Sequence, residues 1–372
     1  MPMKILVTGG AGFIGSHIVD KLVTMGHDVR VIDNLEPQVH HNKRPDYLNP
    51  NAEYIFDDIK NKKALSSSLK DIEVVFHQAA NVGIGQSMYE IERYVDTNVM
   101  GTARLLDILV NSKNSVKKII VASSMSIYGE GAYECSKCGT VYPELRPEKQ
   151  LKNREWEMKC PHCGEQTKPV PTKENKPLRP TSVYAVSKRD QEELCLSVGR
   201  AYGIPAVALR YFNVYGPRQS LSNPYTGVCA IFSSRIKNGN PPIIYEDGLQ
   251  TRDFVYVDDI VRANIFALEN SSADYKALNV GSGKPTSIFE MSMVLSKLYG
   301  KKIQPQVIKK YRSGDIRHCF ADITGIKKLG FAPKTGFEEG MKKLVQWGEK
   351  AEAIDMVDKA ARELVRRGLV EK

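Results

Sequence analysis

The fold is decided near the start of the chain, by the stretch Lys4-Ile-Leu-Val-Thr-Gly9-Gly-Ala-Gly12-Phe13-Ile14-Gly15. Its first five residues predict a short buried strand. The glycines at positions 9, 12 and 15 let the backbone turn tightly and approach a pyrophosphate closely. A helix is expected through about residue 25, and its N-terminus directs positive charge at that pyrophosphate. The stretch therefore predicts the first turn of a dinucleotide-binding fold.

The next segments continue this pattern and indicate the ligand. A strand expected at residues 28–32 ends in Asp33, whose carboxylate would accept hydrogen bonds from ribose hydroxyls and repel a 2′-phosphate. NAD is therefore favoured over NADP. Further strands are expected at 54–57, 73–77, 118–122 and 206–210, and a long helix at 91–112. The fold class is α/β: a Rossmann-type doubly wound parallel sheet, followed by a smaller C-terminal α/β substrate domain.

Tyr184 and Lys188 form the candidate catalytic motif. They stand four residues apart at an expected helix start, so both side chains project from one face. An ammonium beside a phenol lowers the phenol pKa, and a phenolate is a general base for an alcohol proton. Alone, this motif also fits an ordinary surface helix. The serine cluster at residues 123–126 follows the fifth strand, at the same edge of the sheet, and should meet Tyr184 in space.

Two Cys-x-x-Cys-Gly knuckles interrupt the sheet pattern. They contain Cys135, Cys138, Cys160 and Cys163, and 21 residues (139–159) lie between them. This spacing is typical of a zinc ribbon with four thiolate ligands, and four reactive cysteines without metal are the alternative. Four thiolates saturate a tetrahedral zinc ion, so the metal would be structural.

Composition restricts the class of protein and its partners. The chain has 372 residues, 42% hydrophobic and 26% charged, with a net charge of +10. Its apolar runs are shorter than the roughly 18 residues of a membrane span. The N-terminus reads as a strand and not as a signal peptide, so a cytoplasmic location is expected. Residues 133–168 contain seven basic and six acidic residues, and this near balance of charge argues against a nucleic-acid-binding ribbon.

Six ordered motifs resemble the extended short-chain dehydrogenases that act on nucleotide sugars. They are residues 8–15, Ser-Ser-Met-Ser-Ile-Tyr-Gly (123–129), Tyr-Ala-Val-Ser-Lys (184–188), Arg-Tyr-Phe-Asn-Val-Tyr-Gly-Pro (210–217), Arg-Asp-Phe-Val-Tyr-Val-Asp-Asp (252–259) and Gly-Asp-Ile-Arg-His (314–318). The resemblance implies an NAD site made by Gly9, Gly12, Phe13, Ile14, Gly15, Asp33, Asn34, Asp58, Ile59, Gln78, Ala79, Ala80, Asn98, Tyr184 and Lys188. It implies a nucleotide-sugar site made by Ser124, Ser126, Asn213, Asn223, Arg252, Arg312 and Asp315.

The serine motif separates the reactions known in that family. Its 4,6-dehydratases carry Thr-Asp-Glu where this chain has Ser124-Met125-Ser126. Met125 cannot protonate a leaving hydroxyl, Ser126 is a poor base, and Glu130 is expected to lie beyond the turn. Oxidation chemistry is therefore present and elimination chemistry is missing, which leaves 4-epimerisation. Tyr184 would take the sugar 4-hydroxyl proton through Ser124, with transient oxidation at C4 and non-stereospecific hydride return.

Three features narrow the resemblance: Asn-Pro-Tyr-Thr-Gly (223–227), Glu-Asp-Gly-Leu-Gln (246–250) and the insertion with the Cys-x-x-Cys knuckles. Together they look most like the dTDP-L-rhamnose 4-epimerases, which give dTDP-6-deoxy-L-talose. UDP-glucose, UDP-N-acetylglucosamine and UDP-glucuronate 4-epimerases are alternatives, and so is a zinc-ribbon NAD-binding protein without catalysis. Relatives pair through two long helices, so a homodimer is expected through 91–112 and 183–201. Apolar faces of these helices carry Leu105, Leu106, Leu109, Leu194 and Leu196, and packing of the same leucines against the sheet is the alternative.

The expected domain organisation follows the motifs. Residues 1–131 and 169–212 would form the NAD-binding domain, interrupted by the zinc-ribbon insertion at 132–168. Residues 213–350 would mainly bind the nucleotide sugar. A C-terminal helix is expected within 351–372, beginning at residue 351.

Overall fold

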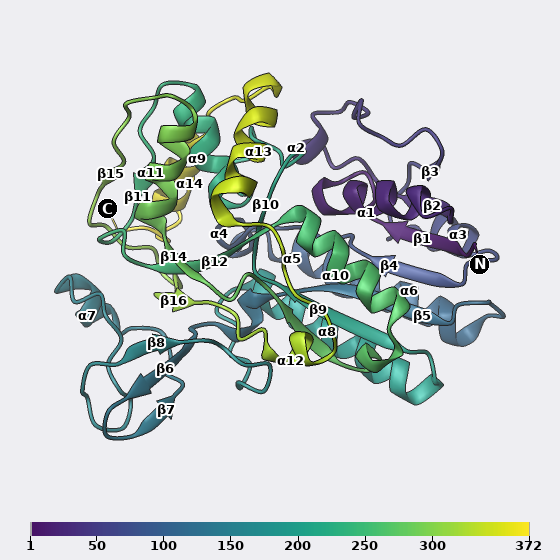
Figure 1. Cartoon of the computed structure of the whole chain (residues 1–372), viewed down its shortest axis with the longest axis horizontal. Helices are drawn as coiled ribbons and strands as arrows, with labels where there is room; N and C mark the ends of the chain where they lie inside the picture. Colours follow the sequence, from purple (N-terminus) through teal and green to yellow (C-terminus); the bar gives the residue numbers. More distant parts are fainter. Residues whose placement is uncertain (1, 372) are drawn as a thin grey trace.

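The computed structural model describes residues 2–371, and a seven-stranded parallel sheet forms its centre (Figure 1). The strand order is β13-β9-β5-β4-β1-β2-β3. The strands are β1 (Lys4–Thr8), β2 (Asp28–Ile32), β3 (Glu53–Ile55), β4 (Val74–His77), β5 (Lys118–Ser124), β9 (Ala206–Tyr211) and β13 (Ala277–Val280). The order reverses between β1 and β4, and ligands of such sheets bind outside the carboxyl ends of the strands at this switch point.

Helices cover both faces of the sheet, as the Rossmann-type prediction requires. One core lies beneath α1 (Phe13–Thr24) and α10 (Val257–Glu269), and the other beneath α3 (Lys62–Ser68), α6 (Gly101–Asn111) and α8 (Val183–Tyr202). The central strands are buried along almost their whole length, which explains their continuous Val, Ile and Ala runs. The short elements are α2 (Pro37–His40), α4 (Ile84–Ser87), α12 (Thr324–Lys328), η2 (Met125–Tyr128) and η3 (Ser271–Ala273).

The helix expected at 91–112 contains a change of winding. It starts as α5 (Ile91–Tyr94), passes through a π-helical segment, η1 (Val95–Met100), and continues as α6. Asn98 lies in the π-helical part and is fully buried. Such widened turns are rare and often mark functional sites, and the apolar periodicity of the sequence does not report them.

A second lobe packs over the carboxyl edge of the sheet. It contains the strands β10 (Asn213–Tyr215), β11 (Ile243–Ile244), β12 (Thr251–Tyr256), β14 (Pro285–Ser287), β15 (Gln306–Val307) and β16 (His318–Cys319), and the helices α9 (Val228–Lys237), α11 (Ile288–Leu298) and α13 (Phe337–Lys350). The region expected mainly for substrate (213–350) also returns to the main sheet, because α10 covers it and β13 pairs with β9.

The C-terminal helix begins later than expected. It is α14 (Val357–Arg366), and α13 ends at Ala351 in an extended conformation. The prediction of a helix from residue 351 was wrong, because the segment 351–356 bonds to the end of α9 instead of to itself. Lys237 donates to the Ala351 carbonyl, and the Asn238 side chain donates to the Ala353 carbonyl at 2.9 Å.

The cysteine-bearing insertion forms a small separate sheet. Its strands β6 (Ala132–Cys135), β7 (Gly139–Val141) and β8 (Lys168–Val170) pair in the order β7-β6-β8, and α7 (Glu148–Lys152) lies in the loop between them. The insertion projects at the lower left of Figure 1, beside β16. Its buried cluster consists of Tyr133, Cys135, Val141, Met158 and Cys160. Five side chains are too small a core to hold about 35 residues without further support.

The leucines expected to form a dimer surface face inward instead. Leu105, Leu106, Leu109 and Leu196 are buried in the core beneath the sheet, and Leu194 packs against the same core. Of the two neighbours that the sequence left open for this apolar face, a second chain or the sheet, the structure shows the sheet. The exposed large apolar residues on these helices are Ile91 (54% exposed), Val95 (38%), Met100 (44%), Val186 (44%) and, at the end of α8, Tyr202 (60%).

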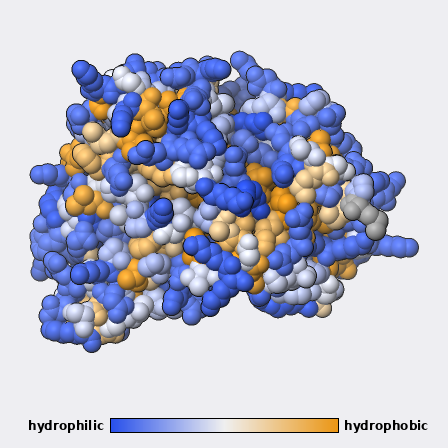
Figure 2. Space-filling model, in the orientation of Figure 1, coloured by the Kyte–Doolittle hydropathy of each residue, from blue (hydrophilic) through white to orange (hydrophobic). Residues whose placement is uncertain are grey.

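The rest of the surface is mostly polar. On the face drawn in Figure 2, hydrophilic residues cover most of the area and apolar residues gather in separate smaller regions. Among the described residues, none of the helices is both long and apolar enough to cross a bilayer.

Candidate active site

A cleft of about 770 Å³ runs along the carboxyl edge of the sheet, between the sheet and the second lobe. Every residue assigned to cofactor, substrate or catalysis from the sequence lines this cleft, with the exception of Asn98. The glycine loop, the serine cluster and Tyr184 come from separate elements, and the parallel topology brings them to one edge.

The glycine loop is shaped for a diphosphate. A Cβ atom on Gly15 would lie 2.2 Å from the Gly9 carbonyl oxygen, so only glycine permits this close turn. Helix α1 begins directly after Gly12 without a side-chain cap. Its first backbone N–H groups therefore face the cleft as donors for an anion. This arrangement fits the pyrophosphate of a dinucleotide.

Asp33, expected from the sequence to contact the adenosine ribose, lines the cleft. Its carboxylate accepts hydrogen bonds from the backbone N–H groups of Ala11 (3.0 Å) and Leu35 (2.9 Å). Burial raises the pKa of Asp33, and these hydrogen bonds lower it in part. The Asn34 side chain donates to the Asp58 carboxylate at 2.9 Å, so two predicted cofactor residues hold one another. The set suits an adenosine with free ribose hydroxyls.

Tyr184 stands at the start of α8, next to the serine cluster. Ser182 caps this helix by accepting from the Ala185 N–H at 3.1 Å, which fixes the first turn and the direction of the phenol. Burial raises the pKa of Tyr184, and hydrogen bonding by the Ser124 hydroxyl lowers it in part. The Ser124 hydroxyl also accepts from the Ser126 hydroxyl at 2.9 Å. The predicted meeting of Ser124 and Tyr184 is confirmed.

Lys188 lies one turn after Tyr184 on α8, and its ammonium donates to the Gln191 side chain. Burial lowers the pKa of Lys188 to about 7. The i, i+4 spacing aligns the two side chains on one face but does not choose the hydrogen-bond partner of either, so the effect of Lys188 on the Tyr184 pKa stays a prediction.

Asn98 lies behind the cleft and not in its lining. Its side chain donates to Ser187 at 2.9 Å and to the Asn81 carbonyl at 3.1 Å, and it accepts from the Asn81 N–H at 2.8 Å. Asn98 therefore joins the π-helical segment to the helix that carries Tyr184. It fixes the positions of cleft residues and does not itself line the cleft.

The residues next to Ser124 offer no acid for elimination. Met125 is 8% exposed and lines the cleft with its thioether. Glu130 is buried outside the cleft lining, where its carboxylate accepts from the Tyr133 hydroxyl (2.6 Å) and from the backbone N–H of Arg317 (2.7 Å). The inference that Glu130 cannot replace the missing acid agrees with this position.

The nucleotide end is formed by the second lobe. Arg252 donates to the carbonyls of Thr251 and Ile316, each at 2.8 Å, and so ties two cleft-lining segments together. The Arg312 guanidinium lies 4.6 Å from the Tyr245 ring centre and pairs with Asp315 at 2.7 Å. Asn213 has a buried side-chain oxygen without a partner among the described residues. This oxygen is therefore available to accept a hydrogen bond from a group bound in the cleft.

Sequence reasoning missed several residues that shape the cleft. His77 and Gln191 form a buried pair beside Lys188, with their side-chain nitrogens 3.0 Å apart. Leu145 from the insertion and Glu246 from the second lobe both line the cleft. The sequence could have indicated Gln191, since it lies three residues after Lys188 on the same helix. Leu145 belongs to no motif, and only the folded position of the insertion reveals it.

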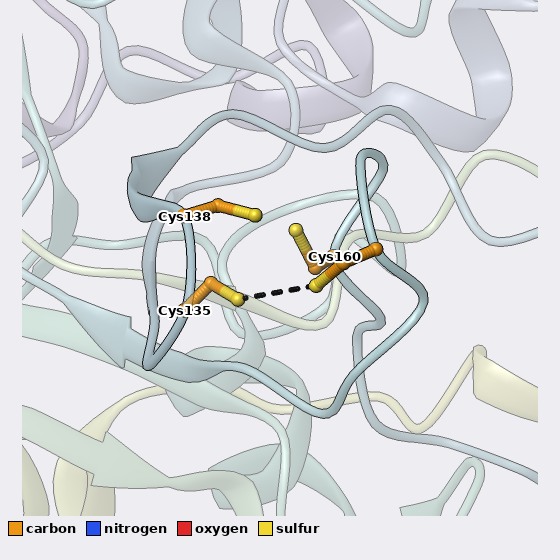
Figure 3. A group of neighbouring side chains, drawn as sticks. Cys135, Cys138 and Cys160 are labelled. Atoms are coloured by element: carbon orange, nitrogen blue, oxygen red, sulfur yellow. Dashed lines mark hydrogen bonds between the residues drawn. The ribbon is translucent and has the colours of Figure 1, made fainter.

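The four cysteines converge as their spacing predicted. Figure 3 shows the side chains of Cys135, Cys138 and Cys160 directed toward a common centre. The four sulfur atoms lie within 4.8 Å of one another, and those of Cys135 and Cys163 are 3.5 Å apart. Thiolates at zinc's usual 2.3 Å bond length would be about 3.8 Å apart. The geometry therefore fits a tetrahedral ion.

Comparisons with known proteins agree with this site. A model of the NAD dependent epimerase/dehydratase family matches residues 5–149 and 161–281, and the gap lies within the insertion. The chain is 38% identical over 352 residues to the dTDP-L-rhamnose 4-epimerase of Burkholderia thailandensis, covering 92% of this chain and 94% of the relative. It is 36% identical over 345 residues to a putative UDP-glucose 4-epimerase of Methanocaldococcus jannaschii, covering 92% and 97%.

Solved structures give the same result. The UDP-glucose 4-epimerase of Thermotoga maritima, solved with UDP-glucose, has a TM-score of 0.76 at 35% identity and covers 94% of this chain and 99% of its own. The UDP-glucose 4-epimerase of Thermus thermophilus, solved with NAD, has a TM-score of 0.75 at 30% identity, with coverage of 94% and 100%. With the glycine loop, Asp33, Ser124, Tyr184 and Lys188 along one cleft, the chain belongs to the NAD dependent epimerase/dehydratase family, as an NAD-dependent nucleotide-sugar 4-epimerase.

Proposed function

We propose that this 4-epimerase interconverts dTDP-L-rhamnose and dTDP-6-deoxy-L-talose. Tyr184 as phenolate takes the proton of the sugar 4-hydroxyl, and Ser124 bridges the two oxygens. Lys188 and the glycine loop hold the cofactor, which when bound accepts the C4 hydrogen as hydride and returns it. The resulting 4-keto sugar turns about its diphosphate, so that hydrogen returns to the opposite face and Tyr184 gives back the proton.

The observation that carries the sugar assignment is the apolar residue next to Ser124. Met125 lines the cleft together with Ser124, and its side chain suits the C6 methyl group of a 6-deoxy sugar better than a hydroxyl or a carboxylate. Arg93 lies in the same lining but already pairs with Glu90 at 2.6 Å and Glu36 at 3.1 Å. A glucuronate carboxylate would have to compete for that cation.

A UDP-sugar is the second candidate substrate. Relatives that are UDP-glucose 4-epimerases are 36% and 35% identical to this chain, close to the 38% of the dTDP-L-rhamnose enzyme. UDP-N-acetylglucosamine and UDP-glucuronate fall in the same class of alternatives. A zinc-ribbon NAD-binding protein without catalysis is disfavoured, because Ser124, Tyr184 and Lys188 line one cleft together.

One experiment separates these candidates. The purified protein is incubated with dTDP-L-rhamnose, UDP-glucose, UDP-N-acetylglucosamine or UDP-glucuronate without added cofactor, and products are followed by proton NMR. We expect the highest kcat/KM with dTDP-L-rhamnose. Substrate carrying deuterium at C4 should keep its label in the product, because the hydrogen leaves and returns within one site. A requirement for stoichiometric NADPH would exclude the proposal in favour of a reductase.

We also propose that Cys135, Cys138, Cys160 and Cys163 hold one structural zinc ion. The sulfur distances support this, and so do Gly139 (φ +70°) and Gly164 (φ +76°), which follow the second cysteine of each knuckle in the left-handed turn that glycine favours. Four protein ligands leave no open position for water or substrate. Metal analysis of freshly purified, reduced protein should give one zinc per chain, and a value near zero would exclude the site.

We further propose a homodimer, with Ile91, Val95, Met100 and Val186 as the contact in place of the buried leucines. These side chains are exposed on neighbouring helices of one chain, and apolar clusters on helices favour burial against a partner. Val186→Asp should shift the protein to monomer in light scattering at micromolar concentration, whereas Lys113→Asp at an exposed site should not. A wild-type monomer would exclude this assembly. The cytoplasmic location and the domain limits drawn above stay predictions.

A further inference from the structure

The insertion is tied to the nucleotide end of the cleft by a buried arginine. Arg146 lies between β7 and α7, with 1% of its side chain exposed. Its guanidinium donates to both carboxylate oxygens of Glu246, at 2.7 and 2.9 Å. It also donates to the carbonyl oxygens of Asp315 (3.2 Å) and of Trp156 in its own insertion (3.0 Å). One side chain therefore holds three segments that are far apart in the sequence.

The two segments that Arg146 holds outside the insertion both line the cleft. Glu246 follows Tyr245, and Asp315 is the partner of Arg312, whose guanidinium lies over the Tyr245 ring. The backbone N–H of Glu246 also donates to the Lys310 carbonyl at 2.8 Å. The position of these segments thus depends on how Glu246 is held.

Glu246 has a backbone conformation that needs such support. Its φ is +56°, a left-handed value that is uncommon for a residue with a side chain and costs free energy unless the surroundings impose it. Its carboxylate is buried and lies between two arginines, Arg146 and Arg317, the latter at 3.0 Å. Paired charges explain how a buried carboxylate and a strained backbone persist together.

A second link from the insertion reaches the same place. Arg317 is fully buried and pairs with Glu157 of the insertion and with Asp247 at 2.6 Å. Glu157 also lies 3.2 Å from the His318 ring nitrogen. The insertion is therefore docked through one ion pair that is buried on both sides, Arg146–Glu246, and through a second in which Arg317 is buried and Glu157 is 44% exposed. The buried pair restricts geometry more tightly than an exposed one.

We propose that the insertion is the outer wall of the nucleotide pocket, and that Arg146 is a positioning residue for the nucleoside diphosphate part of the substrate. By holding Glu246 and the Asp315 backbone, it places the segments with Tyr245 and Arg312 against the nucleotide. It stands outside the serine cluster and α8, which carry the chemistry. The inference rests on the proposed function only in taking a nucleotide sugar as ligand, and not on which sugar it carries.

The test measures nucleotide binding apart from catalysis. Isothermal titration gives the Kd of dTDP and of UDP for wild type, Arg146→Gln, Arg146→Lys and the control Arg154→Gln. Arg154 is in the same insertion, but its pair with Glu371 is partly exposed, at 42% and 24%. Losing charge-assisted hydrogen bonds should weaken binding by roughly tenfold or more in Arg146→Gln. Arg146→Lys should recover part of this, because lysine keeps the charge but not the bidentate geometry, and the control should match wild type.

Kinetics and a reciprocal variant complete the test. Arg146→Gln should raise KM with kcat nearly unchanged, the signature of lost binding that the ground and transition states share. Bound NAD and metal content should equal wild type. If Arg146→Gln does not fold, Glu246→Gln tests the same link from the other side, and it should weaken nucleotide binding similarly.

The outcomes separate this inference from the proposed function. Unchanged Kd values in both Arg146→Gln and Glu246→Gln would overturn the inference and leave the epimerase assignment standing. A wild-type protein that binds neither dTDP nor UDP would overturn the nucleotide-sugar function and the inference with it. Weakened nucleotide binding in a protein inactive on dTDP-L-rhamnose would support the inference and overturn only the sugar assignment.

Discussion

A buried ion pair beside the catalytic groups provides a stability test with a matched control. Glu192 lies on α8 two turns after Tyr184 and is 3% exposed, and its partner Arg210 on β9 is 6% exposed. The Glu192 carboxylate accepts from the Arg210 guanidinium and from the Ser123 hydroxyl, each at 2.6 Å. The change Glu192→Gln keeps the size of the side chain, removes its charge, and leaves the Arg210 cation buried without a counter-ion.

The expected loss in the free energy of unfolding follows from the burial of this ion pair. Removing one partner of a buried pair costs about 3–5 kcal/mol. With an unfolding entropy of about 2.1 cal/mol/K per residue, cooperative unfolding of the 372 residues should shift its midpoint down by roughly 4–6 °C. Differential scanning calorimetry measures this shift, and urea unfolding gives the free energy independently.

The adjacent residue is the control. Glu193 pairs with Arg189 at 2.8 Å on the same helix, but the two side chains are 50% and 41% exposed. An exposed pair contributes about 0–1 kcal/mol, so Glu193→Gln should move the midpoint by about 1 °C or less. Equal shifts in the two variants would refute the reasoning, since both changes remove one carboxylate charge from α8 and the two ion pairs differ in burial.

Three further predictions concern catalysis, pH and metal. Tyr184→Phe should lower kcat by roughly 10²–10⁴ with unchanged nucleotide binding, because it removes the base; Ser124→Ala should cost less, and NMR turnover assays measure both. His77 is buried and its pKa is lowered to about 3, so below pH 6.5 the unfolded chain binds one more proton than the folded one. Stability should therefore fall as pH drops from 6.5 to 5, by about 1.4 kcal/mol per pH unit; urea unfolding should show a flatter dependence in His77→Gln. Chelation of the proposed zinc ion should weaken dTDP binding in titrations, and so should Cys138→Ser. Bound NAD, measured by absorbance, should be retained in both cases. A dTDP affinity equal to that of the wild type would show that the insertion does not contribute to the nucleotide pocket.

The sequence predicted the parts of the site that depend on local spacing. The glycine loop, the acid at the end of β2 and the capped helix with Tyr184 each need a fixed distance along the chain, so their residue types appear in order. The parallel topology then brings them to one edge, which sequence order also indicates. The convergence of the four cysteines could be predicted for the same reason, because their spacing within two short knuckles is visible in the sequence.

What the sequence did not reveal depends on neighbours rather than on spacing. The edge strand of the seven-stranded sheet, β13, has only four residues. It adopts the strand conformation because it pairs with the open edge of β9. Leu105 and Leu109 show an apolar face, but the pattern cannot say whether the sheet or a second chain covers it. In the same way, Lys188 chooses Gln191 as its partner once both are buried.

The docking of the insertion depends on neighbours far away in the sequence, and so it is the feature that the sequence could least predict. Arg146 and Glu246 are 100 positions apart, and Arg317 and Glu157 are 160 positions apart. Each of these residues, taken alone in the sequence, resembles ordinary surface charge. In the fold, a buried charge requires a partner, and the pair fixes the distance between two segments. By this argument the charged residues of the insertion complete the nucleotide end of the cleft.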